Sequence, residues 1–167
     1  MKKFLIGLVA VVGIVITLFV VFGGQKDILK NMLDSDSIDW TKFTEDELDA
    51  FMKKNNAVFE AGVYKCSFLG YDAKLIIYEK KIDGKEENTY YYINHIVLGI
   101  PYDTQEKENE IMEALDNYIT SELGLNCTGE LMGKDYNGVY KNYNLQVHFG
   151  ESTPGGHVLL DVSGMSE

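Results

Sequence analysis

An uninterrupted apolar segment at the N-terminus limits where this chain can fold. The segment begins at Phe4, ends at Phe22 and contains 19 residues without a charge, and Lys2 and Lys3 precede it. At about 1.5 Å per residue, a helix of this length spans roughly 28 Å, close to the roughly 30 Å hydrocarbon core of a bilayer. Because positive charge stays in the cytoplasm, residues 1–24 are predicted to span the membrane once, with the following chain outside.

Two kinds of membrane targeting are compatible with this segment. A signal anchor stays in the membrane, whereas a secretory signal peptide has a shorter apolar region of roughly 7 to 15 residues and small residues before its cleavage site. Cleavage after Gly23 or Gly24 would leave Val21 or Phe22 three positions back, which makes a weak site. The sequence therefore predicts a single-pass cell-membrane protein, with a secreted form after cleavage as the alternative.

The exported part has the length of one domain. Residues 25–41 are expected to form a juxtamembrane helix and linker, and residues 42–167 an extracytoplasmic α+β domain. Periodicity and turn signals predict helices over 44–54 and 105–123, and strands over 63–69, 73–82, 89–98, 127–132, 139–149 and 157–163.

Local signals support several of these boundaries. Thr44 and Glu47 have the spacing of a capping box, which marks a helix start. Asn137 followed by Gly138 is the strongest short hairpin signal, and it predicts a turn before the strand over 139–149. The order of a helix and three strands, repeated once, predicts two α-β-β-β units with two helices packed on a mainly antiparallel sheet.

The charge of the chain excludes one class of partner. All 15 basic residues are lysine, and without Lys2 and Lys3 the remaining 13 face 26 acidic residues. Such a surface repels nucleic acid, and a chain without arginine lacks the usual side chain for bidentate phosphate recognition. We therefore expect no nucleic-acid partner, although acidity also serves solubility alone.

Two cysteines, Cys66 and Cys127, lie in the exported part, where oxidising conditions permit a disulfide. A bridge between them would close a loop of about 60 residues and stabilise the fold by roughly 4 kcal/mol. The alternative is a pair of buried free thiols that behave as small hydrophobic groups. The sequence favours the Cys66–Cys127 bridge.

Motifs for catalysis and cofactor binding are absent from the sequence. It contains no G-x-S-x-G nucleophile turn, no Walker loop and no dinucleotide-binding glycine pattern. Carboxylates are abundant, but pairs such as Glu106 and Glu110 indicate the solvated face of a helix. We therefore predict a protein that is not an enzyme and binds no cofactor.

Two histidines form the one constellation with possible chemistry. His148 and His157 flank a predicted turn between two strands. If Val147 pairs with Val158, both histidines lie opposite each other on the outer face of this hairpin. A shift of the pairing by two residues keeps the core intact and separates them.

Glu151 and Asp161 could add oxygen ligands to His148 and His157, a mixture that suits zinc. Histidines on an exposed hairpin are more often solvated than ligating, so no metal is expected. His95, on another strand, is expected to pack in the core.

The eleven tyrosines suggest a different kind of site. If Tyr90 and Tyr92, or Tyr136 and Tyr140, are exposed together, their rings would form an aromatic contact surface for a sugar or a peptide. Tyrosine is also a good strand former, which explains its abundance without any ligand.

Together these patterns predict a membrane-anchored, extracytoplasmic and non-catalytic module. It would bind an envelope protein or glycan, or support a membrane complex. The alternative is a small metal-assisted hydrolase that uses His148 and His157.

Overall fold

The computed structural model describes residues 27–82, 89–130, 133–152 and 156–165 of the 167-residue chain. The predicted membrane-spanning segment over 1–24 lies outside these residues. In the part of the chain that is described, no helix is long and apolar enough to cross a membrane.

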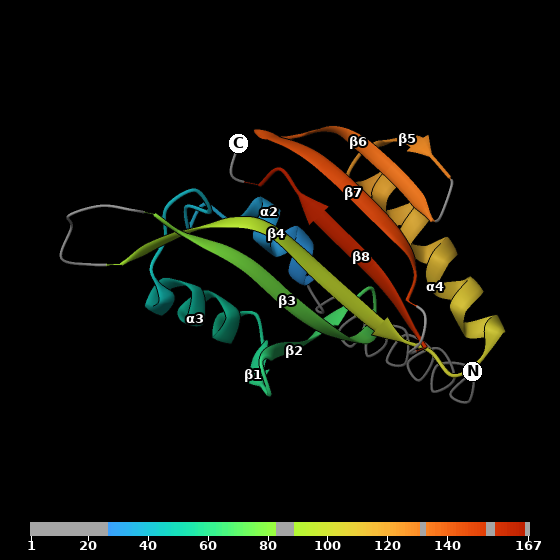
Figure 1. The fold of residues 1–167 in the computed structure, drawn as a ribbon, viewed down its shortest axis with the longest axis horizontal. Helices are drawn as coiled ribbons and strands as arrows, with labels where there is room; N and C mark the ends of the chain where they lie inside the picture. Colours follow the sequence, from blue (N-terminus) through green and yellow to red (C-terminus); the bar gives the residue numbers. More distant parts are fainter. Residues whose placement is uncertain (1–26, 83–88, 131–132, 153–155, 166–167) are drawn as a thin grey trace, which may run out of the picture.

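The described residues form four helical elements and eight strands (Figure 1). The helical elements are α2 (Ile28–Asp34), α3 (Glu45–Lys54), α4 (Gln105–Asn117) and the π-helical turn η1 (Tyr118–Glu122). The strands are β1 (Val58–Glu60), β2 (Val63–Phe68), β3 (Tyr71–Ile82), β4 (Tyr90–Pro101), β5 (Asn126–Gly129), β6 (Lys134–Tyr140), β7 (Tyr143–Ser152) and β8 (His157–Ser163).

All eight strands belong to one antiparallel sheet, in the order β1-β2-β3-β4-β8-β7-β6-β5. Strands β1 to β4 form one meander after α3, and β5 to β8 form a second after α4. The last strands of the two meanders, β4 and β8, pair at the centre of the sheet. The predicted α+β class with a mainly antiparallel sheet is confirmed. Each unit has four strands instead of three. In the first unit the short edge strand β1 was not predicted, and in the second the strand predicted over 139–149 is divided between β6 and β7.

The helix starts follow the predicted capping signals. Thr44 Oγ1 accepts from the backbone N–H of Glu47 at 3.3 Å, and the Glu47 carboxylate accepts from the N–H of Thr44 at 2.8 Å, which completes the capping box of α3. Thr104 caps α4 by accepting from the N–H of Lys107 at 3.2 Å. The helix predicted over 105–123 is α4 continued by η1.

Helix α2 belongs to the core of the domain. Four of its side chains are fully buried there: Ile28, Leu29, Met32 and Leu33. The indole N–H of Trp40 donates to the Met32 carbonyl at 2.8 Å, and its ring packs edge-on against Phe43 and Phe51. Residues predicted as a juxtamembrane helix and linker over 25–41 thus contribute side chains to the same core as the sheet.

The helices that the structure describes cover only one of the two faces of the sheet. In β8, Val158, Leu160 and Val162 point into the core, whereas the residues between them are partly exposed. Helix α2 contacts β2 and α4 contacts β8, both on the covered side (Figure 1). Among the described residues no helix packs on the opposite side of the sheet, which we call the open face.

One predicted turn is wrong. Asn137 and Gly138 lie inside β6, and the turn to β7 comes later, at Lys141, which has a φ of 52°. The strand predicted over 139–149 is therefore split between β6 and β7. Gly138 serves close packing instead of a turn, since a Cβ atom there would lie 3.1 Å from Leu125 Cδ2.

Candidate functional site

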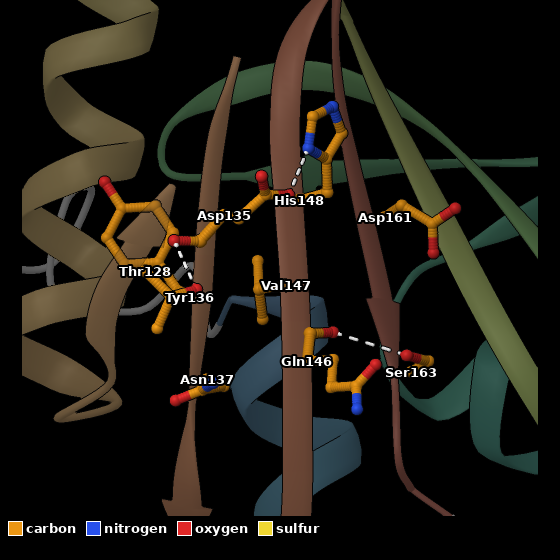
Figure 2. A pocket seen from close by; sticks show the side chains of 9 residues that line it. All are labelled: Thr128, Asp135, Tyr136, Asn137, Gln146, Val147, His148, Asp161 and Ser163. Atoms are coloured by element: carbon orange, nitrogen blue, oxygen red, sulfur yellow. Dashed lines mark hydrogen bonds and ion pairs between the residues drawn. The ribbon is translucent and has the colours of Figure 1, made fainter. Parts of the chain in front are cut away.

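Two joined depressions mark the open face. The first lies over β6, β7 and β8 and has a volume of about 370 Å³. The second lies over β8, β7 and the neighbouring parts of β3 and β4, with a volume of about 640 Å³. Both are lined by Gln146, Asp161 and Ser163, so they form one continuous surface. Figure 2 shows the side chains that line the first depression, with helices behind the strands.

Strand pairing places a line of polar side chains across this surface. Asn137 of β6 pairs with Gln146 of β7, which pairs in turn with Ser163 of β8. Ser163 also pairs with His95 of β4, and His95 pairs with Tyr78 of β3. Because directly paired residues share one face, these five residues form a continuous row, which we call the polar row.

A second row on the open face contains a contact between an imidazole and a carboxylate. His148 of β7 pairs with Asp135 of β6 on one side and with Asp161 of β8 on the other. The His148 Nδ1 atom lies 2.7 Å from Asp135 Oδ1 (Figure 2). This contact fixes the imidazole orientation and leaves Nε2 as the ring nitrogen available to a ligand.

The polar row ends in an aromatic pair. The rings of Tyr78 and His95 are stacked, with centroids 4.3 Å apart and planes inclined by 15°. Tyr78 is 45% exposed, and Asn94 Nδ2 lies 2.7 Å from His95 Nδ1. The register of β3 and β4 shifts between Tyr78 and Glu79, a bulge of the kind that re-aims side chains. His95 therefore lies half-buried on the open face, contrary to the expectation that it packs in the core.

The first predicted tyrosine pair lies on the open face. Tyr92 lines the second depression. Tyr90 lies two residues earlier on β4, and the Lys42 ammonium sits 4.2 Å from its ring centroid. Lys42 thus covers part of Tyr90, and Tyr92 is the member of the pair that a ligand can reach.

The second predicted tyrosine pair does not form a contact surface. Tyr136 is buried on the covered face, stacks on Phe149 and donates its hydroxyl proton to Asp116. The hydroxyl of Tyr140 donates to Asp34 at 2.8 Å, which ties β6 to the end of α2. Both rings have structural partners on the helix side of the sheet.

The histidine pair is separated by the observed register. His148 pairs with Asp161, whereas His157 pairs with Ser152, four positions further along β7. At about 3.3 Å per residue this separation is roughly 13 Å, too far for one metal ion to bridge. Glu151 is the neighbour of Ser152 in β7. No group of three or more His, Cys, Asp and Glu side chains in the described residues could hold a metal ion.

The predicted disulfide is not formed. Cys66 lies on β2, the second strand of the sheet, and Cys127 on β5, the edge strand at the far side, and both thiols are free. Six strand spacings of about 4.8 Å separate the two strands, whereas a disulfide needs Cα atoms within about 7 Å. Burial raises the pKa of the Cys66 thiol to about 11, so this cysteine behaves as a small protonated hydrophobic group.

A buried carboxyl lies on the covered side of the sheet, at the start of α2. Asp27 Oδ1 accepts from the backbone N–H of Leu29 at 2.9 Å and caps the helix. Asp27 Oδ2 and the Tyr118 hydroxyl are both buried without a well-aligned hydrogen-bond partner, and each influences the pKa of the other. Burial raises the pKa of Asp27 to about 6, and the Tyr118 hydroxyl opposes part of this shift.

Sequence reasoning identified some residues of the open face but not their arrangement. His148, Asp161 and Tyr92 were singled out, and all three line its depressions. Gln146 and Ser163, which join the two depressions, were missed. The alternation of polar and apolar residues in β7 placed Gln146 and His148 on one side, but the strand order that brings Ser163 next to Gln146 has no local signal.

Comparison with known proteins gives no match to a protein-family model, a curated protein or a solved structure. The proposals below rest on the geometry and chemistry of the open face.

Proposed function

We propose that this protein is an extracytoplasmic, non-catalytic binding module, anchored in the cell membrane by residues 4–22, that holds its ligand on the open face. The observation that carries the proposal is a sheet face on which no described helix packs, with two joined depressions lined mainly by polar side chains. An uncovered antiparallel sheet face presents a wide surface whose side chains are positioned by a rigid backbone.

Binding is favoured over catalysis because the reactive groups of the open face are not arranged as a catalytic unit. His148 is oriented by Asp135, as a general base would be. The hydroxyl of Ser163, in the neighbouring polar row, is not paired with His148, because it donates to the backbone carbonyl of Gln146 at 3.5 Å. The metal-assisted hydrolase has less support, since the register separates His148 from His157.

The ligand class follows from location and charge. A module held outside the membrane meets envelope proteins and glycans, and the acidic exported part disfavours nucleic acid. We therefore place an envelope component on the open face.

Blocking the open face should remove this binding. Gln146→Lys combined with Ser163→Lys puts two long cationic side chains where the depressions meet, and we expect about a tenfold loss of affinity or more for the isolated envelope fraction of the producing cell. The measurement is co-sedimentation of the full-length chain, in lipid nanodiscs, with that fraction.

The matched control for this pair is Asn109→Lys combined with Asn117→Lys, which adds the same charge at exposed positions of α4 on the other side of the sheet. The control should bind like the unsubstituted chain. Equal loss in both double variants, or unchanged binding after blocking the open face, would rule out the open face as the binding surface.

The anchor is tested separately from the ligand. The unbroken apolar run from Phe4 to Phe22 predicts that the chain stays with membranes through an alkaline carbonate wash and keeps its N-terminal peptide in mass spectrometry. Val11→Arg combined with Val15→Arg should prevent insertion, because each central arginine costs about 3 kcal/mol on insertion scales. Leucine at the same two positions is the control. A soluble species that starts at Gly24 would instead identify a cleaved signal peptide.

A further inference from the structure

We propose that the ligand of the open face is a neutral glycan, with sugar rings packed against the Tyr78–His95 stack and sugar hydroxyls bound by the amides beside it. This inference rests on the proposed function of the open face as a binding surface. It adds the chemical class of the ligand and the residues that select it.

The side chains that line the second depression match hydroxyl groups. Asn94, Asn144 and Gln146 carry amides, which combine N–H donors with a carbonyl acceptor, and Ser163 adds a hydroxyl. One Asn94 N–H is taken by His95, and the Ser163 hydroxyl, which donates to the Gln146 backbone carbonyl, still accepts through its oxygen. A sugar hydroxyl likewise donates and accepts. A surface of side-chain amides therefore satisfies a row of sugar hydroxyls without placing a net charge on either partner.

The charges of this depression balance. Lys80 and Asp161 are its charged residues, and they carry opposite signs. A charged ligand would gain from one of them and lose to the other, whereas a neutral ligand depends on neither. Charge complementarity thus favours a neutral glycan over an anionic polysaccharide.

The apolar half of such a site comes from His95, which lines the second depression, and from the exposed Tyr78 ring that stacks on it. Tyr78 and His95 are stacked on each other, and each ring keeps one face turned away from its partner. The negative face of an aromatic ring attracts the polarised C–H groups that line one side of a sugar ring. Asn94 holds the His95 ring, so little side-chain entropy is lost when a ligand binds.

The shape of the surface suits a chain of sugars. The second depression alone, at about 640 Å³, lies within the roughly 300–1,000 Å³ of small-molecule sites. Gln146, Asp161 and Ser163 continue it into the first depression, so several linked sugars could lie along the polar row. A protein partner would be expected to bury an apolar centre, but amide, hydroxyl and charged groups occupy the place where the depressions meet.

The test uses the envelope fraction as the probe and destroys one component at a time. Periodate cleaves the vicinal diols of sugars, and protease removes envelope proteins. We expect periodate treatment of the fraction to abolish its binding to the full-length chain in nanodiscs, protease treatment to leave it, and added salt to leave it unchanged because the ligand is neutral. Nanodiscs replace glycoside detergents, which would compete for the site.

Substitutions then test whether the named residues bind the glycan. Tyr78→Ala and Gln146→Ala should each weaken binding about tenfold, a loss of roughly 1.4 kcal/mol. The matched controls are Phe59→Ala, an exposed aromatic residue on β1, and Asn109→Ala on α4, which should bind normally.

The possible failures are distinguishable. Binding that depends on the open face but is lost after protease treatment and kept after periodate would overturn the glycan and retain the binding module. Strong weakening by salt would replace the neutral ligand with a charged one. Binding that the double substitution Gln146→Lys and Ser163→Lys leaves unchanged would overturn the proposed function together with this inference.

Discussion

Replacing Trp40 with alanine should lower the free energy of unfolding by about 4 kcal/mol, in the range measured when large buried aromatic residues are truncated. Trp40 is 1% exposed, and its indole N–H donates to the Met32 carbonyl at 2.8 Å. Its ring meets Phe43 and Phe51 edge-on, with centroid distances of 5.9 and 5.0 Å. The substitution would thus open a cavity between α2, α3 and β4 and leave the Met32 carbonyl with only the longer hydrogen bond from the Ser35 N–H, at 3.4 Å.

Urea unfolding of the full-length chain, followed by circular dichroism, measures this effect. Phe59→Ala is the control, since Phe59 is 62% exposed and its removal should change stability by less than about 0.5 kcal/mol. Trp40→Phe keeps an aromatic ring but removes the N–H donor, and should fall between the two. A loss below about 1 kcal/mol for Trp40→Ala would show that the segment before α3 is not part of the core.

Replacing Asp27 with asparagine should stabilise the protein by about 2 kcal/mol at neutral pH. Burial raises the pKa of this carboxyl from 3.8 to about 6, so the fold favours its protonated form. The folded chain binds more protons than the unfolded chain between these values, and stability therefore falls as pH rises from about 4 to about 6. Asparagine cannot ionise and caps a helix as well as aspartate does, so α2 keeps its cap.

Thermal or urea unfolding at several pH values tests the sign of this effect. The drop in stability between about pH 4 and pH 6 should be smaller in Asp27→Asn than in the unsubstituted chain. Asp39→Asn is a control with the opposite effect. Hydrogen bonds from Thr41 lower the pKa of Asp39, so the fold favours its charged form. Removing this carboxylate should therefore slightly destabilise the protein at pH values above the pKa of Asp39. An Asp27→Asn variant that is less stable at neutral pH would show that the charged form is the one the fold prefers.

The sequence predicted local structure well where the determining interactions are local. The capping box of Thr44 and Glu47 lies within four residues, and the alternation in β8 follows from the period of a strand. Both were predicted and both are present. The Asn137–Gly138 signal failed because a glycine that permits a turn also permits close packing, and only the tertiary contact with Leu125 decides between them.

Register and strand order could not be predicted in the same way. The expected pairing of Val147 with Val158 and the observed pairing with Val162 differ by four residues, and both keep the same side chains in the core. This even shift moves His148 away from His157 and places it beside Asp161. The candidate site therefore depends on a choice that the hydrophobic pattern leaves open.

The cysteines illustrate the same limit at a longer range. Cys66 and Cys127 both lie in strands, as expected, but the two meanders extend in opposite directions from the central pair of β4 and β8. An early strand of either meander is therefore far from an early strand of the other. Strand character alone predicts neither neighbours nor distances.

The central pairing of β4 with β8 also determines when this sheet can be completed as the chain is synthesised. Helix α4 and three strands separate the two in the sequence, so the first meander is synthesised before its central partner is. Until then β4 presents an unpaired edge with Ile96, Leu98 and Ile100 along it, the kind of edge that recruits other chains. Pairing across so many residues is slow, and the excess of negative charge keeps neighbouring nascent chains apart while the gap in the sheet is open.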